Sequence, residues 1–376
     1  MPRVYLDHAS VSPLRPAAFD AMVPFLRDHT GDPGRVHSDG RVTRVAIEVA
    51  REQVAALLGA RPREIVFTSG ASESVNSAIF GAVRRDSERR GIVTTAVEHS
   101  SVLEACARES GPTTVVGVDG TGRFDPNAVL AAIAADTALV SVQLANHDVG
   151  TVQTVGELTA AAREQGVLVH VDACAAIGYS PVDFAAIGAD LMSATAHTWG
   201  GGLGAGALVI RRGLRIPPLL LGGAQERNRR AGLENVPAIV GFGAAAEALK
   251  PSLGVEIKHQ TQLTDRIRVG LAETCTGLTL HGHPTTRLPN LVCFGVDGVE
   301  AEPILLALDQ HGIAIHSGSA CASESLEPSP VLAAMGADAD HSLRVSVGWT
   351  STDADIDGLL EVFPGIIDRM RGLRTP

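Results

Sequence analysis

The sequence has little of several features that mark whole classes of protein. Aromatic residues make up only 3% of its 376 residues, and no apolar run approaches the length that crosses a bilayer, about 20 residues. No lysine- and arginine-rich stretch is interleaved with aromatics, as a nucleic-acid surface requires. The N-terminal segment also lacks the basic start and apolar stretch of a secretory signal. We therefore expect a soluble cytoplasmic protein, with neither a membrane nor nucleic acid as a partner.

Cysteine and lysine are scarce as well. The five cysteines form no C-x-x-C pair, and their wide spacing argues against a disulfide framework and against a metal site. Of the 31 basic residues only Lys250 and Lys258 are lysines. The net charge of −11 comes from scattered acidic residues rather than from an acidic tail. We expect reduced thiols and no metal, and any chemistry that needs a lysine amine has only two candidates.

What the sequence does contain is a regular alternation of short apolar runs with amphipathic stretches of helical length. This alternation extends from about residue 13 to residue 250 and is typical of β–α units around a parallel sheet. Runs with the length and composition of buried strands span residues 64–68, 91–97, 138–145, 167–173 and 205–212. We therefore predict an α/β fold whose large sheet is mostly parallel.

The pattern changes after residue 250. A long helix is predicted over residues 255–275, and the short strands and helices that follow indicate a smaller α+β domain. No internal repeat or low-complexity linker separates the two parts. We predict a large domain of residues 13–250 and a small domain of residues 1–12 and 251–376.

Functional residues are expected where the strands of the large sheet end, because ligands of open α/β sheets bind at the carboxyl ends of the strands. The segments at these ends read SGASES, EHSS, NHDVG, DACAA and AHTWGGG. They are rich in small and polar side chains. We expect these segments to line one site.

Eight segments of the chain together resemble the motifs of one enzyme family. In chain order they are YLDHASVSPLRP, GDPGRVHSDGR, EIVFTSGASESVNSAI, VEHSSVL, HVDACAAIG, GGAQERNRRAGLENVPAIVG, HSGSACASESLEPSPVL and SLRVSVGWTSTDADID. Their order and spacing are similar to those of the cysteine desulfurases, and the resemblance covers nearly the whole chain. It implies a class V aminotransferase fold of fold type I, with a seven-stranded type of sheet, and a homodimer. It also implies a reaction in which pyridoxal phosphate helps to break the C–S bond of cysteine and a loop cysteine holds the sulfur as a persulfide.

The resemblance assigns roles to residues of this chain. Asp172 corresponds to the partner of the pyridine nitrogen, which makes the ring an electron sink. His99 corresponds to the residue that lies on the ring and moves protons. Arg344 corresponds to the residue that binds the substrate carboxylate with two parallel hydrogen bonds. The phosphate is expected at a helix start and a strand end, on Ser69, Gly70, Ala71, Ser72, Thr195 and His197.

One cysteine stands out from the other four. Cys321 lies in HSGSACASESLEP, whose small residues predict a loop that solvent and partners can reach. The resemblance identifies Cys321 as the sulfur acceptor, a role that depends on its thiolate. The remaining cysteines are expected to be small structural residues of the interior, and they are Cys106, Cys174, Cys275 and Cys293.

The chain departs from the family where the cofactor is anchored. The family has histidine followed by lysine, and the lysine amine forms the Schiff base with the cofactor. Here the same place reads His197-Thr198, and a threonine hydroxyl cannot form a Schiff base. Lys250 and Lys258 are far along the chain from every cofactor motif. The flanking segments leave no room for a different alignment of Thr198, which an ordinary desulfurase would require.

Three further departures fall on the same pocket. His147 and Ala175 replace the asparagine and the glutamine that contact the ring oxygen of the cofactor, and Leu233 replaces the threonine that reaches the partner subunit's phosphate. A hydrogen bond to a charged group is worth about 1.5–3 kcal/mol. We therefore expect pyridoxal phosphate to be bound weakly, non-covalently or not at all, and we interpret the four changes as divergence of the whole pocket.

Three functions are consistent with this pattern. The first is a sulfur-handling protein that uses Cys321, with a sulfur donor or acceptor protein as partner. The second is an enzyme that uses pyridoxal or pyridoxamine phosphate non-covalently on a small amino-acid ligand, with His147, His99 or His197 as the base. The third is a non-catalytic scaffold or regulatory homologue, because a fold does not fix a function.

Overall fold

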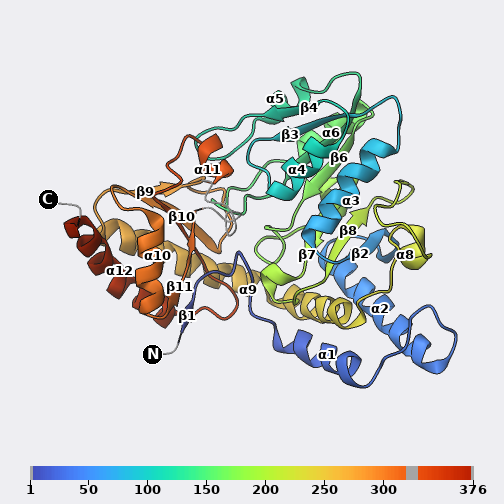
Figure 1. Cartoon of the computed structure of the whole chain (residues 1–376), viewed down its shortest axis with the longest axis horizontal. Coiled ribbons are helices and arrows are strands. Elements are labelled where there is room, and N and C mark those ends of the chain that lie inside the picture. Colours follow the sequence, from blue (N-terminus) through green and yellow to red (C-terminus); the bar gives the residue numbers. More distant parts are fainter. Residues whose placement is uncertain (1–2, 319–328, 374–376) are drawn as a thin grey trace.

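A seven-stranded sheet dominates the computed structural model, which describes residues 3–318 and 329–373 (Figure 1). From edge to edge the strands are β2 (Ile65–Thr68), β8 (Gly206–Ile210), β7 (Leu191–Thr195), β6 (Leu168–Asp172), β5 (Thr137–Gln143), β3 (Gly91–Thr95) and β4 (Thr113–Val116). Neighbouring strands are parallel, except that β8 is antiparallel to both β2 and β7. The predicted α/β class and the mostly parallel sheet are confirmed.

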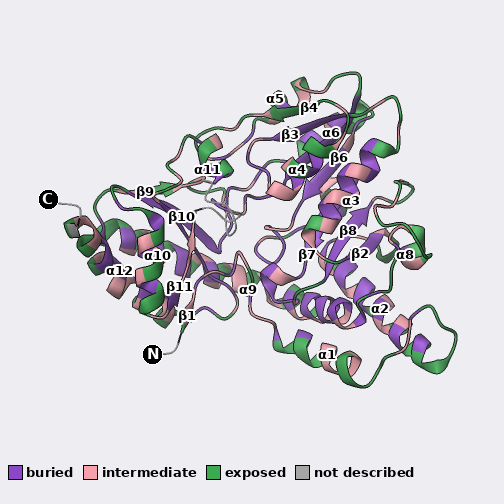
Figure 2. Ribbon diagram, in the orientation of Figure 1, coloured by how far each residue is buried: buried purple, intermediate pink, exposed green. Residues whose placement is uncertain are grey.

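Helices cover both faces of this sheet, and Figure 2 shows its strands as buried except for the edge strand β4. Successive side chains of a strand point to opposite faces, so Ile65 and Phe67 belong to one core and Val66 to the other. The helices of this part are α1 (Pro16–Arg27), α2 (Ser38–Leu57), α3 (Ala71–Arg84), α4 (Ser100–Arg108), α5 (Pro126–Ala131), α6 (Gly156–Glu164), α7 (Phe184–Ile187) and α8 (Gln225–Asn228), with short 3-10 turns at Pro62–Glu64 and His197–Trp199. α3 and α4 cover the Val66 face, whereas α2 and α6 cover the other. Burial on both faces explains why the strands read as continuous apolar runs.

The second body is built around a four-stranded antiparallel sheet. Its strands are, in order, β12 (His316–Ser317), β13 (Ser342–Ser346), β10 (Leu291–Val296) and β9 (Leu278–His281). The N-terminal strand β1 (Val4–Tyr5) pairs in parallel with β11 (Ile313–Ala314). Its helices are α10 (Ala301–Gln310), α11 (Pro330–Ala334) and α12 (Asp353–Leu373). The N-terminal residues thus lie beside the C-terminal part of the chain.

The long helix α9 (Val236–Thr274) connects the two bodies. It packs against α1 and α2 in its first part and against α12, β9 and β10 in its second. The sequence pattern predicted only residues 255–275, because the first part is buried and lacks an amphipathic period. The helix passes residue 250 without interruption. None of the described helices is long and apolar enough to cross a membrane.

Candidate active site

A cavity of about 530 Å³ lies where β5, β6 and β7 end and α3 begins. The carboxyl ends of parallel strands meet at one edge of a sheet, which is why segments far apart in sequence converge there. The sequence-predicted residues that line it are Ser69, Gly70, Ala71, Ser72, His99, His147, Asp172, Ala175, Thr195, His197, Thr198 and Arg344. Cys321 lies outside the described residues.

One end of the cavity presents hydrogen-bond donors at the start of a helix. Ala71 and Ser72 are in the first turn of α3, whose cap residue Gly70 has no side chain to accept their N–H groups. β8 can approach this turn because Gly206 has no Cβ, which would lie 2.7 Å from the Gly70 backbone. Such a helix start favours an anion such as phosphate.

Two side chains on the other side of this end belong to β7 and to the turn after it. The Thr195 hydroxyl and His197 Nδ1 lie 2.7 Å apart and form a hydrogen bond. Burial lowers the pKa of His197, and the neighbouring His99 lowers it further. His197 is therefore neutral at physiological pH and can serve as a donor or an acceptor, but not as a cation.

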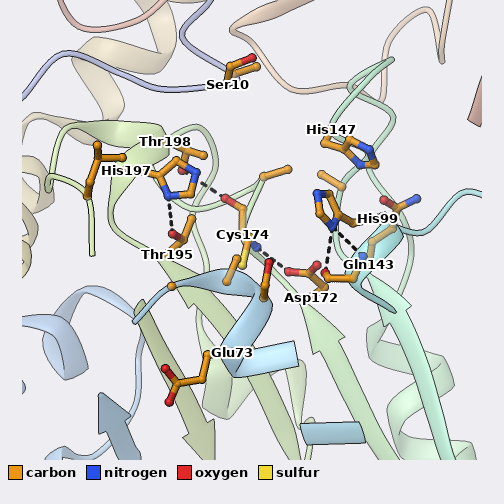
Figure 3. A pocket seen from close by; sticks show the side chains of 18 of the residues that line it. Ser10, Glu73, His99, Gln143, His147, Asp172, Cys174, Thr195, His197 and Thr198 are labelled. Atoms are coloured by element: carbon orange, nitrogen blue, oxygen red, sulfur yellow. Dashed lines mark hydrogen bonds between the residues drawn. The ribbon is translucent and has the colours of Figure 1, made fainter. Parts of the chain in front are cut away.

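Asp172 stands at the end of β6 and is 8% exposed. Its Oδ1 accepts a hydrogen bond of 3.0 Å from the Cys174 N–H. Figure 3 shows Asp172 and Cys174 between His197 and Thr198 on one side and His99 and His147 on the other. A carboxylate in this position can pair with a protonated ring nitrogen.

Two histidines form the wall opposite Thr198. The rings of His99 and His147 meet edge to face, with centroids 5.1 Å apart. His99 is also the cap of α4, because its Nδ1 accepts a 3.1 Å hydrogen bond from the Ser101 N–H. His147 Nε2 lies 3.8 Å from Oδ1 of the buried Asp148. The capping bond therefore fixes the orientation of the His99 ring in the cavity wall.

Thr198 occupies the position where the family pattern has lysine, and its surroundings hold it firmly. Its hydroxyl donates a 3.3 Å hydrogen bond to the Cys174 carbonyl, and its own carbonyl accepts one from the Tyr179 hydroxyl. Lys250 and Lys258 are exposed on α9 and do not line the cavity. No lysine amine of this chain therefore reaches the cavity.

Arg344 extends from β13 of the second body into the wall of the cavity, and it is 1% exposed. Its Nη2 donates to Asp7 at 3.0 Å and to Ser10 at 2.7 Å, and its Nη1 donates to the His147 carbonyl at 3.1 Å. Asp148 Oδ1 is 3.5 Å from Nη1. The guanidinium is thus shared between two carboxylates of the chain itself.

Sequence reasoning missed several residues of the wall, among them Glu73, Gln143 and Cys174. Gln143 is 3% exposed, and its Nε2 has no hydrogen-bond partner within the described ranges. Gln143 is the last residue of β5 and lies two residues before the end of the predicted run 138–145. Its place at the strand end could therefore have been found only with the correct limit of the strand. A buried donor without an acceptor indicates a wall built for a polar ligand.

The cysteines fall into two groups. Cys106, Cys275 and Cys293 are buried, as a structural role requires, and burial raises the pKa of Cys106 to about 12. The expectation of an interior role was wrong for Cys174, which is only partly buried and lines the cavity because it follows the strand end at Asp172. Burial and the Asp172 carboxylate raise the pKa of Cys174. Its thiol therefore stays protonated and is a poor nucleophile.

Leu233 does not line this cavity. It lies 64% exposed beside a smaller cavity of about 160 Å³, together with Arg230 and Glu234. Arg230 pairs with Glu73 at 2.8 Å, which connects the segment around Leu233 to the first turn of α3.

Among the described residues, no group of three or more His, Cys, Asp and Glu side chains is placed to hold a metal ion.

The sheet, the second body and the strand-end cavity together define a chain of the class V aminotransferase type, and the model of that family, Aminotransferase class-V, matches residues 4–359. The chain belongs to the cysteine desulfurase family. It is 42% identical to a cysteine desulfurase of Trichormus azollae, over 98% of this chain and 94% of that protein. It is 41% identical to the cysteine desulfurase IscS of Dictyoglomus turgidum, over 98% and 95%. A solved structure of a NifS-like protein aligns with a TM-score of 0.91 at 31% identity, over 98% of this chain and all of that one.

Pyridoxal phosphate is the usual cofactor of this family. The described side chains suit its phosphate and its ring but not its covalent attachment to the chain. The helix start at Ala71 and the pair Thr195 and His197 suit a phosphate, while Asp172 suits a protonated ring nitrogen. The unpartnered Gln143 amide suits an acceptor atom on a ring. Among the described residues of the cavity wall, none has an amine for a covalent link. The cavity therefore fits a group of this kind held without a bond to the chain.

Proposed function

We propose that this protein is a sulfur-handling member of the cysteine desulfurase family that does not carry out the lysine-dependent cleavage of cysteine. The observation that supports the proposal is Thr198, whose hydroxyl stands in the cavity wall while both lysines are exposed on α9. A covalently held pyridoxal phosphate supplies the electron sink for breaking a C–S bond. This chain has no amine with which to hold it in that way.

Sulfur is carried by Cys321 in this proposal. A persulfide donor R–S–SH reacts with the Cys321 thiol, the outer sulfur moves to Cys321, and the donor leaves as the thiol R–SH. The transfer breaks one S–S bond, forms another and needs no oxidant.

The partners are a sulfur donor or acceptor protein and a second copy of the chain. The cytoplasm stays the predicted location, which cell fractionation can check.

Mass spectrometry of the intact chain tests the sulfur proposal. After incubation with a polysulfide, Cys321 is expected to gain one sulfur atom, and the modification is expected to disappear in Cys321→Ser. Cys106→Ser is the matched control, because Cys106 is buried and should not contribute. Release of sulfide from free cysteine and pyridoxal phosphate at the rate of an ordinary desulfurase would contradict the proposal. So would an unmodified Cys321.

A second candidate is an enzyme that acts on an amino acid with a non-covalent vitamin B6 phosphate. The cavity favours it, because Asp172 and Arg344 both stand in its wall. In this candidate His147, His99 or His197 acts as the base. Equilibrium dialysis against both vitamers tests it, and no binding at high micromolar concentration removes it. A chain that neither binds a vitamer nor carries sulfur on Cys321 would be left with the role of a scaffold.

A further inference from the structure

The charges around the cavity are unbalanced. Glu73 is paired with Arg230 at 2.8 Å. Arg344 faces two carboxylates, Asp7 at 3.0 Å and Asp148 at 3.5 Å.

Asp172 accepts a hydrogen bond from the Cys174 N–H and is in no ion pair within the described part of the chain. His197 is neutral, because burial lowers its pKa. Glu73, Asp172 and Arg344 line the cavity, and Asp7, Asp148 and Arg230 are paired with these residues from behind the wall. The six groups comprise four carboxylates and two guanidiniums. A ligand that brings only a phosphate and one cationic ring would leave this excess of negative charge in place.

The hydrogen-bonding state of Thr198 adds a second, independent constraint. A hydroxyl has one proton to donate and two positions at which it can accept. The Thr198 proton is directed to the Cys174 carbonyl at 3.3 Å, so only the acceptor positions of the oxygen remain for a ligand. An aldehyde oxygen can only accept, so a bond from Thr198 to it would turn the hydroxyl proton away from the Cys174 carbonyl. An ammonium group only donates, and finds an acceptor there.

We propose that the cavity binds the amine form of the vitamin B6 phosphates, pyridoxamine phosphate, non-covalently and in preference to the aldehyde form, pyridoxal phosphate. The ammonium group of this ligand replaces the positive charge that a lysine at position 198 would have supplied. Gln143 contributes to both forms alike, because its buried, unpartnered Nε2 can donate to a ring substituent that the two vitamers share. The discrimination therefore comes from Thr198 and from the surplus of carboxylates.

Isothermal titration of the full chain with each vitamer tests this preference. Pyridoxamine phosphate is expected to bind at least about tenfold tighter than pyridoxal phosphate, because a single charge-assisted hydrogen bond changes an affinity by that factor or more. Pyridoxal phosphate also reacts with exposed lysine amines, which would imitate binding. The Lys250→Arg/Lys258→Arg double variant removes both side-chain amines, and both residues are exposed and outside the cavity. Equal or tighter binding of pyridoxal phosphate in this variant would overturn the proposal.

A single substitution should reverse the preference. Thr198→Lys restores an amine to the cavity, so pyridoxal phosphate should become the tighter ligand and should stay attached after borohydride reduction, as intact mass shows. Thr285→Lys is the matched control, because Thr285 is exposed and does not line the cavity. Binding of neither vitamer to the unaltered chain would also overturn the inference. That result would leave the sulfur proposal standing, since the Cys321 assay needs no cofactor.

Discussion

Thr198 does not leave an empty place where the family pattern has lysine. Its hydroxyl is bonded to the Cys174 carbonyl and its carbonyl to the Tyr179 hydroxyl. The next residue is also fixed, because the Trp199 indole N–H donates to the Thr195 carbonyl at 2.8 Å. Only the bond to the Cys174 carbonyl uses the Thr198 side chain, whereas the other two are accepted by backbone carbonyls. This arrangement agrees with the interpretation that the whole pocket has diverged.

Gln143 provides the first prediction at the scale of single residues. Its buried Nε2 lacks a partner within the described ranges, and an unsatisfied buried donor costs about 1–3 kcal/mol. Gln143→Leu should therefore raise the free energy of unfolding of the ligand-free protein by about 1 kcal/mol, measured by denaturant titration. The same change should weaken pyridoxamine phosphate binding at least about tenfold.

Gln153 is the matched control for this experiment. It is buried too, but its Nε2 donates to the Gly122 carbonyl at 2.7 Å and its Oε1 accepts from the Phe124 N–H. Gln153→Leu should lower stability and leave ligand affinity unchanged. If Gln143→Leu also lowers stability and spares binding, Gln143 is a structural residue and has no part in the site.

Glu98 leads to a prediction about pH. It is 1% exposed, its Oε2 has no partner within the described ranges, and burial raises its pKa to about 8. The folded protein therefore keeps the proton of Glu98 at a pH where the unfolded chain has lost it. The contribution of Glu98 to stability is complete below its unfolded pKa and is lost as the pH rises through about 8.

The Glu98→Gln variant removes this titration. As the pH rises from about 5 to about 8.5, the free energy of unfolding of the variant should increase relative to that of the unaltered protein. The increase should exceed about 1.4 kcal/mol, the value of one pKa unit. Denaturant titrations of both proteins at both pH values measure this difference in stability. Other titrating groups, such as His170, contribute equally to both proteins and therefore cancel. A difference that stays constant with pH would show that Glu98 is ionised in the folded state.

At the scale of elements, the sequence predicted five of the seven strands of the large sheet, without β4 and β7, and it did not predict their directions. The five quoted runs correspond to β2, β3, β5, β6 and β8, each within a few residues. A run that is buried on both faces has no feature that distinguishes a parallel from an antiparallel neighbour, so the reversal of β8 was not predictable. α9 was predicted only in its second part, because residues buried all round give no amphipathic period.

The short helix α8 shows how one element depends on a buried ion pair. Glu226, Arg227 and Asn228 all have positive φ, at 46°, 59° and 62°, which is unfavourable for residues with a side chain. Glu226 is held there because its two carboxylate oxygens each accept a 2.7 Å hydrogen bond from Arg51, and one also accepts from the Phe67 N–H. This contact fixes the segment whose Arg230 pairs with Glu73 in the cavity wall.

Arg51→Leu tests this dependence. It leaves Glu226 buried without its charged partner, and breaking a buried pair in this way costs about 3–5 kcal/mol. Arg266→Leu is the control, since Arg266 is partly exposed on α9 and its pairs with Asp353 and Asp357 lie at the surface. That change should cost no more than about 1 kcal/mol. A similar loss for both variants would show that the Arg51 pair does not stabilise α8 beyond a surface contact.

At the scale of the whole molecule, the site combines residues from both bodies. Asp172, Thr195 and Thr198 could be placed from the sequence, because strand ends of one parallel sheet must meet. The surroundings of Arg344 could not, since it is bonded to Asp7, a residue 337 positions away, and no local pattern indicates that pair. Gln143 was missed for a related reason, because only the packed structure shows that its donor has no acceptor.

An exposed apolar stripe on α2 supports the predicted homodimer. One face of α2 packs against α9, with Ile47 and Val54 buried. Val42, Val45 and Val49 lie on another face at helical spacing and are 41%, 61% and 47% exposed. Such a stripe indicates a surface that another chain covers. A second copy is the occupant we predict, since a stable interface needs an apolar centre of this kind.

Sedimentation of a charged variant tests the dimer. The unaltered chain should sediment as a dimer at micromolar concentration. Val45→Glu/Val49→Glu should be monomeric with an unchanged circular dichroism spectrum, because two carboxylates would be buried unpaired in the interface. Val255→Glu/Val269→Glu is the control, because these valines are 73% and 56% exposed on α9. If both double variants stay dimeric, the chains associate through another face, and a monomer in every case would contradict the dimer itself.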